Sequence, residues 1–126
     1  MSSKKDNFTS QDKKFMQLAL KLASVRKGLT GENPSVGCLI VKNDQIISIG
    51  QTGLNGRPHA EHNAIKNSVE NVRGSKMYVT LEPCNHYGKT PPCTNSIIKS
   101  GISEIIYGMD DIDKKVKGKS FKILSN

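Results

Sequence analysis

Four side chains in the middle of the sequence have the types and the spacing of a metal site. His59 and Glu61 stand where a loop rich in glycine and proline gives way to a helical pattern, and Cys84 and Cys93 each follow a proline. One imidazole and two thiolates form a three-ligand zinc shell, which leaves the fourth tetrahedral position open for water, as catalytic zinc sites do. The sequence therefore predicts a catalytic Zn²⁺ centre with His59, Cys84 and Cys93 as its ligands.

Glu61 is the predicted proton carrier of this centre. Zinc lowers the pKa of a bound water to about 7, and a neighbouring base must take up the proton that is released. Residues two apart on a regular helix point about 200° apart, so His59 and Glu61 reach one cavity only at an irregular first turn, which residues 56–58 favour. We expect Glu61 to accept the proton and to pass it to a ring nitrogen and then to a leaving amine.

The composition narrows the class of protein. A chain of 126 residues favours one domain, and that length buries enough surface for a core without disulfides. The sequence has no stretch of about 20 apolar residues, and its N-terminus lacks the features of a signal peptide. Three cysteines are an odd count for a disulfide scaffold, so we expect a cytoplasmic protein. The net charge of +8 suits nucleic acid, an anionic substrate or a solvated basic surface, and does not choose among them.

Hydrophobic periodicity predicts the elements that position these residues. Residues 1–9 are expected to be a flexible tail, and Thr9 and Asp12 have the spacing of a helix-opening cap. The helix that follows should end at Gly28. Its predicted core face is Phe15, Leu18, Leu22 and Val25. The further expected elements are strands at 35–42 and 45–50 around an Asn43–Asp44 turn, helices at 59–69 and 93–100, and strands at 77–81 and 104–107.

This order of elements predicts an α/β protein in which a sheet is covered by helices on both faces. Cys93 stands just inside the start of a predicted helix, where the positive end of the helix dipole favours the thiolate. Residues 110–120 carry many Lys and Asp residues and are expected to form a solvated segment or a lid.

The pattern His-Ala-Glu, then Pro-Cys, then a second Cys resembles the zinc-dependent nucleobase deaminases. Their common form has two residues between the cysteines, whereas this chain has eight. Residues 80–84 and 86–93 make it resemble the deaminase domain of the riboflavin-biosynthesis deaminase/reductase family. The similarity runs from about Met16 to Gly118 and also includes Gly28, Thr30, Asn33–Pro34, residues 36–38 and residues 97–102.

The resemblance implies a three-layer α/β/α sandwich with a mixed central sheet, similar to cytidine deaminase. It implies hydrolytic deamination of a diaminopyrimidine that carries a ribosylamino 5′-phosphate, with release of ammonia in an early step of riboflavin biosynthesis. It also implies that Asn33, His86 and Lys89 contact the substrate. Members of the family commonly self-associate, so a homo-oligomer is expected, with a phosphorylated pyrimidine and neither nucleic acid nor membrane as the partner.

Three features depart from the family. Many members carry a histidine where this chain has Gln51–Thr52, and an Asp-Pro-Asn-Pro pattern appears here as residues 111–114, with Asp113 in place of a neutral amide. The lost prolines loosen that loop. The family's C-terminal reductase domain is expected to be absent, which leaves residues 10–126 as the deaminase domain.

Several of these residues also have simpler interpretations. His86 could contact substrate, support a zinc ligand or cap a turn. Lys89 could be a solvated loop lysine, and Asn33 could serve only as a turn residue before Pro34. Cys38 lies in an apolar strand and is expected in the core rather than on the metal.

Three other functions compete with this one. A deaminase acting on adenine or cytosine in nucleic acid, such as a tRNA adenosine deaminase, would suit the charge, but the chain is poor in the aromatic residues that stack bases. A cytidine deaminase would have the shorter cysteine spacing. A non-catalytic zinc module has no need of Glu61 beside an open coordination position.

Overall fold

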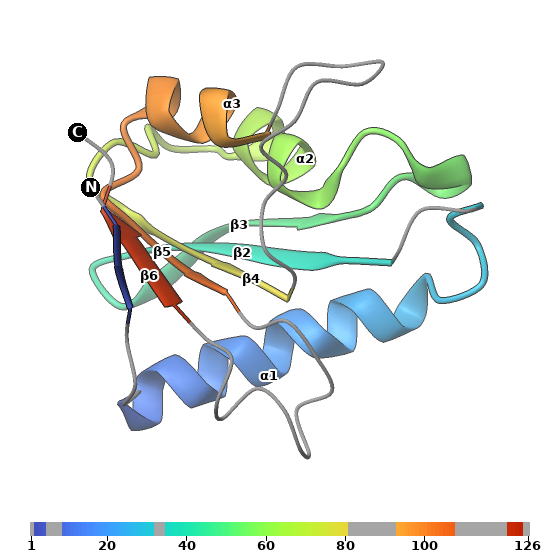
Figure 1. The fold of residues 1–126 in the computed structure, drawn as a ribbon, viewed down its shortest axis with the longest axis horizontal. Coiled ribbons are helices and arrows are strands. Elements are labelled where there is room, and N and C mark those ends of the chain that lie inside the picture. Colours follow the sequence, from blue (N-terminus) through green and yellow to red (C-terminus); the bar gives the residue numbers. More distant parts are fainter. Residues whose placement is uncertain (1, 5–8, 32–34, 81–92, 108–120, 125–126) are drawn as a thin grey trace.

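The computed structural model describes the backbone of residues 2–4, 9–31, 35–80, 93–107 and 121–124, and most side chains within 9–31, 35–80 and 97–106. The elements are β1 (Ser2–Lys4), α1 (Ser10–Val25), β2 (Gly37–Lys42), β3 (Gln45–Gln51), a short 3₁₀ turn (Leu54–Gly56), α2 (Ala60–Asn67), β4 (Lys76–Val79), α3 (Cys93–Ser100), β5 (Glu104–Tyr107) and β6 (Phe121–Leu124). Helix α1 lies on one face of the sheet, and α2 and α3 lie on the other (Figure 1).

The strands form one mixed sheet in the order β1-β6-β5-β4-β2-β3. Strands β4 and β5 run parallel, and every other neighbouring pair is antiparallel. A parallel pair needs a crossover connection, usually a helix, and α3 is the described helix between β4 and β5. The sequence-based prediction of a mixed α/β sheet covered on both faces is confirmed.

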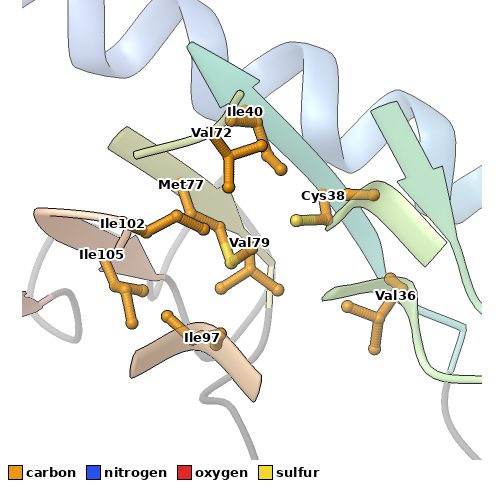
Figure 2. Close-up of a cluster of buried hydrophobic side chains, with 11 residues drawn as sticks. Val36, Cys38, Ile40, Val72, Met77, Val79, Ile97, Ile102 and Ile105 are labelled. Carbon is orange, nitrogen blue, oxygen red and sulfur yellow. The ribbon is translucent and has the colours of Figure 1, made fainter. Parts of the chain in front are cut away.

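Alternate residues of the central strands build two cores. Cys38, Ile40 and Val79 point toward α2 and α3 and pack with Ile97 (Figure 2). On the other face, Leu39, Val41 and Tyr78 pack against α1. Burying each large side chain of this kind contributes about 1.5–3 kcal/mol, so the central strands are the rigid part that carries the helices. Cys38 is fully buried, which confirms its predicted place in the core.

Helix α1 begins with the predicted cap. The Asp12 backbone N–H donates to Thr9 Oγ1 over 2.9 Å, and the Thr9 N–H donates to Asp12 Oδ2 over 3.2 Å. The predicted core face, however, is wrong for two of its members, because Leu18 is 37% exposed and Val25 is 69% exposed. The buried side consists of Asp12, Phe15, Met16 and Ala19.

The shift of the core face has a steric cause at Gly37. A Cβ built on Gly37 would stand 2.0 Å from the Ala19 carbonyl oxygen, so the helix backbone lies directly on the strand. A contact this close needs small residues on both sides, and a pattern of bulky apolar residues cannot indicate it.

Most of the other predicted elements are present. The turn residues Asn43 and Asp44 both have positive φ, 53° and 63°, which is the backbone of a two-residue hairpin turn. The tail prediction differs from the structure, because Ser2–Lys4 form β1 and pair with β6. Neither of these edge strands was among the expected elements, since strand pairing through the backbone requires no apolar pattern.

A buried hydrogen bond joins α1 to the centre of the sheet. The Tyr78 hydroxyl donates to Asp12 Oδ1 over 2.6 Å, and the rings of Tyr78 and Phe15 lie 5.2 Å apart. Burial, and then the neighbouring Asp12 carboxylate, raise the pKa of Tyr78 well above its ordinary value of 10.0. The folded chain therefore favours the un-ionised phenol.

We expect Tyr78→Phe to lower the free energy of unfolding at neutral pH by about 2 kcal/mol, because a buried carboxylate loses a hydrogen bond. The contribution from the raised Tyr78 pKa is fully present below pH 10 and is lost as the pH rises above it. Urea unfolding across this range should show a steeper alkaline loss in the wild type than in Tyr78→Phe. Equal slopes in the two proteins would contradict the assignment.

Among the described residues, no helix combines the length and the apolar composition that a membrane crossing requires.

Candidate functional site

The strand directions bring the predicted site residues to one end of the sheet. Strands β3 and β4 both pair antiparallel with β2, so they run in the same direction, and β5 runs parallel to β4. A helix that connects parallel strands runs back across the sheet, so α2 and α3 both start at the carboxyl ends of these strands (Figure 1). Ligand sites of α/β sheets lie at this end.

His59 is the N-cap residue of α2. Its φ of −71° and ψ of 160° are extended rather than helical, and its carbonyl accepts a hydrogen bond from the Asn63 N–H over 3.0 Å. His59 therefore precedes the helix while Glu61 lies in the first turn. The regular helical angle between residues two apart does not apply to this pair. The predicted irregular start is confirmed, and the His59 side chain is half-buried.

Glu61 is a buried acid, with 5% of its surface exposed. Burial raises the pKa of its carboxyl from 4.5 to about 7 in the metal-free chain, against a smaller lowering by a hydrogen bond with its own backbone. A carboxyl group with a pKa near the working pH can both accept and release a proton. This is the property that a proton carrier in hydrolysis requires.

Glycine at position 50 allows α2 to bury this acid. A Cβ built on Gly50 would stand 2.3 Å from the Ala60 carbonyl oxygen and 2.6 Å from the Ala64 nitrogen. The first turn of α2 therefore lies directly on β3, which places Glu61 below the surface.

The loop of residues 53–58 leads to His59, and a hydrogen bond joins its two ends. The Gly53 N–H donates to the Pro58 carbonyl over 2.9 Å, and the Arg57–Pro58 peptide bond is cis. The Asn63 side-chain amide donates to the Gln51 carbonyl over 2.7 Å and to the Pro58 carbonyl over 3.3 Å. Asn63 thus joins the end of β3 to the start of α2. Asn63 was not among the predicted site residues, because its partner Gln51 lies twelve residues away in the sequence.

We expect Asn63→Asp to lower kcat/KM for the deamination expected from the sequence about tenfold or more. The free energy of unfolding should fall by about 2 kcal/mol. The carboxylate would face two carbonyl oxygens and repel them, which shifts His59. Asn67→Asp is the matched control, because Asn67 is exposed on the same helix. Steady-state kinetics and urea unfolding measure the two effects. Equal behaviour of the two variants would show that the brace does not matter.

The structure brings together only part of the predicted residue set. His59 and Glu61 lie at the start of α2, and α3, which contacts α2, begins at Cys93. Cys84, Asn33, His86 and Lys89 lie outside the described residues, as does the Cys93 side chain. Within the described side chains, no three His, Cys, Asp or Glu residues surround one point.

The chemistry of the described residues at this end of the sheet suits a zinc centre. A half-buried imidazole lies beside a buried acid, and a cysteine occupies the first position of the neighbouring helix. The positive end of a helix dipole favours a thiolate at that position, and a thiolate is the form of cysteine that binds zinc.

A cleft at the other end of the sheet is a different feature. Its volume is about 500 Å³, and it is lined by residues that include Asp12, Lys42, Arg73, Lys76 and Tyr78. Its described lining contains neither His nor Cys. The chemistry of the sequence motif therefore lies away from this cleft.

Comparison with known sequences finds relatives that match most of this chain. Residues 9–109 match the family model of the cytidine and deoxycytidylate deaminase zinc-binding region. Riboflavin biosynthesis protein RibD of Haemophilus influenzae is 48% identical over 119 residues, which are 94% of this chain and 32% of that protein. Diaminohydroxyphosphoribosylamino-pyrimidine deaminase of Buchnera aphidicola is 46% identical over 109 residues, which are 86% of this chain and 74% of that protein.

Solved structures share the fold. RibD of Acinetobacter baumannii superposes with a TM-score of 0.75 at 44% identity, covering 80% of this chain and 28% of that one. The Rib2 deaminase of Aspergillus oryzae in complex with DARIPP gives a TM-score of 0.64 at 28% identity, covering 79% and 72%. This chain spans about a third of the length of the RibD proteins that it matches.

Proposed function

From the premise that the chain belongs to the zinc-binding cytidine and deoxycytidylate deaminase family, on the branch of the diaminohydroxyphosphoribosylamino-pyrimidine deaminases, we propose that it hydrolyses an amino group of a diaminopyrimidine ribosylamino 5′-phosphate. The observation that carries the proposal is the buried Glu61 carboxyl two residues after His59, in the first turn of α2. The reaction breaks a carbon–nitrogen bond, forms a carbonyl from water and releases ammonia.

Three side chains are proposed to hold zinc: His59, Cys84 and Cys93. When bound, zinc supplies Lewis-acid activation that lowers the pKa of water to about 7. The donor set leaves one coordination position for that purpose. We also propose that the chain acts in the cytoplasm, where cysteine ligands stay reduced.

Glu61 moves the protons. Its carboxylate accepts a proton from the attacking water and delivers it to a ring nitrogen. It then accepts the second proton, from the hydroxyl group now attached to the ring carbon, and gives it to the departing amine as the carbonyl forms. Burial raises the pKa of the Glu61 carboxyl above its ordinary value, toward the pH range in which a group both accepts and releases a proton. Burial of the side chain also excludes water, which strengthens the electrostatic interactions of the acid.

Asn33, His86 and Lys89 are proposed to bind the substrate. A lysine in the segment between the two cysteines suits a phosphate as a point charge. The complex of the Aspergillus oryzae Rib2 deaminase with DARIPP supports a substrate of this class. The asparagine and the histidine supply donors and acceptors for the pyrimidine edge.

Ammonia release by the zinc-loaded protein tests the proposal. The diaminopyrimidine ribosylamino 5′-phosphate should release ammonia, whereas cytidine, dCMP and a single-stranded oligonucleotide should release little. Turnover of dCMP alone would overturn the assignment of substrate. If the zinc-loaded protein released no ammonia from any of the four substrates, the proposed activity would be overturned.

A further inference from the structure

Two consecutive residues at the start of β2 are each paired with a threonine. The Val36 N–H donates to Thr52 Oγ1 over 2.8 Å, and the Thr52 N–H donates to the Val36 carbonyl over 3.0 Å. The Gly37 N–H donates to Thr80 Oγ1 over 3.2 Å, and the Thr80 N–H donates to the Gly37 carbonyl over 3.1 Å. Val36 and Gly37 are thus held from both sides, by the ends of two different strands.

In each pair, a side-chain hydroxyl takes the place of a backbone carbonyl. An antiparallel rung ordinarily consists of two N–H to C=O hydrogen bonds between facing residues. Thr52 and Thr80 each stand one residue past the end of their strands, β3 and β4. Both donate their N–H as a further rung requires, but both accept through Oγ1. Each pair of residues therefore makes its two hydrogen bonds without using the backbone carbonyl of the threonine.

The released carbonyl frees the chain to leave the sheet. The Thr52 carbonyl accepts instead from Arg26 Nη1 over 3.1 Å, at the C-terminal end of α1. Thr52 is 1% exposed and Thr80 is 7% exposed. An unpaired N–H at such a buried position costs about 1–3 kcal/mol, so the hydroxyl allows a turn out of the sheet without that cost.

The two exits lead to the two halves of the candidate site. The segment after Thr52 ends at His59 and Glu61, and Cys84 follows Thr80 by four residues. Both exits are tied to the same dipeptide, Val36–Gly37, so a change at one threonine shifts the point at which its own segment leaves the sheet.

We propose that Thr52 and Thr80 are positioning residues. Each accepts a backbone hydrogen bond through its hydroxyl instead of its carbonyl, and this fixes the points at which the two ligand-bearing segments leave the sheet. The inference rests on the proposed function. It also gives Thr52 a role in backbone geometry.

Valine is the sharpest substitution, because it keeps the shape of threonine and removes the acceptor. In Thr52→Val the Val36 N–H loses its acceptor, and in Thr80→Val the Gly37 N–H loses its acceptor. The acceptor that an ordinary antiparallel pair would offer instead is the backbone carbonyl of residue 52 or of residue 80. Using that carbonyl would extend the strand by one residue and redirect the following segment. Serine keeps the Oγ acceptor and should restore the wild-type geometry.

The test measures zinc affinity by competition with a chromophoric chelator, together with kcat, KM and thermal unfolding. We expect each valine variant to bind zinc about tenfold or more weakly, with a loss mainly in kcat, and each serine variant to regain most of both. Ser75→Ala is the matched control, because the buried Ser75 hydroxyl donates to the Val72 carbonyl at the amino end of β4. It should lose stability with unchanged zinc affinity.

Valine variants that lose stability as Ser75→Ala does, but keep wild-type zinc affinity and kcat, would overturn the inference. So would serine variants that fail to recover zinc affinity. If a valine variant fails to fold, hydrogen exchange is measured at the Val36 and Gly37 amides of the serine variants. Weaker protection than in the wild type would show that the hydroxyl hydrogen bonds do not hold these amides, which contradicts the inference. An inactive wild type with intact zinc binding would refute the proposed function, while the zinc-affinity measurements still test the threonines.

Discussion

Replacing Glu61 with glutamine is expected to lower the kcat of deamination about a thousandfold, while the protein keeps its zinc and its fold. Glutamine has nearly the same shape as glutamate but cannot accept a proton. The reaction moves both protons of the attacking water, one to a ring nitrogen and one to the departing amine, and Glu61 is the buried acid at the start of α2. Ammonia release gives the kcat, and a colorimetric assay of the denatured protein gives the zinc content.

Stability separates a catalytic loss from a folding defect. Burial raises the pKa of Glu61 from 4.5 to about 7 in the metal-free chain. The contribution of this group to stability is therefore full below pH 4.5 and is lost as the pH rises through 7. The loss amounts to about 3 kcal/mol, and glutamine, which stays neutral, avoids it.

The metal-free Glu61→Gln variant should thus be at least as stable as the wild type above pH 7 in urea unfolding with a chelator present. A glutamine variant that is less stable there would point to a structural role for the carboxylate. A variant with near-normal kcat would remove Glu61 from the mechanism.

The sequence indicated the chemistry more completely than the packing. His59, Glu61, Cys84 and Cys93 could be proposed from the sequence because each chemical role limits the residue types that can fill it. The Thr9–Asp12 cap was predictable for the same reason, since both partners lie within one helical turn.

Features that depend on distant partners could not be predicted. The core face of α1 is set by its contact with Gly37, and the edge strand β1 exists through its pairing with β6. The same holds for Thr52 and Thr80, whose hydroxyls are ordinary in the sequence and act only because Val36 and Gly37 face them. The sequence therefore predicts a set of reacting groups, while the residues that position the segments carrying them are found only from the fold.

Replacing Cys84 or Cys93 with alanine is expected to remove zinc and reduce deamination to background. A three-ligand shell that loses one thiolate keeps one imidazole and one thiolate, which is too few donors for a stable catalytic site. Cys38→Ala is the matched control, because Cys38 is fully buried in the core formed with Ile40 and Val79. It should cost about 1–2 kcal/mol of stability and keep wild-type zinc content and activity.

Two measurements identify which cysteines bind the metal. Zinc per chain after dialysis should be near one for the wild type and Cys38→Ala, and near zero for the other two variants. Zinc should also raise the unfolding temperature of the first pair and not of the second, because a ligand stabilises only the folded state that binds it. Full zinc occupancy in Cys84→Ala or Cys93→Ala would refute the ligand set. Loss of zinc in Cys38→Ala would place this core thiol, against its burial in an apolar strand, in the coordination sphere.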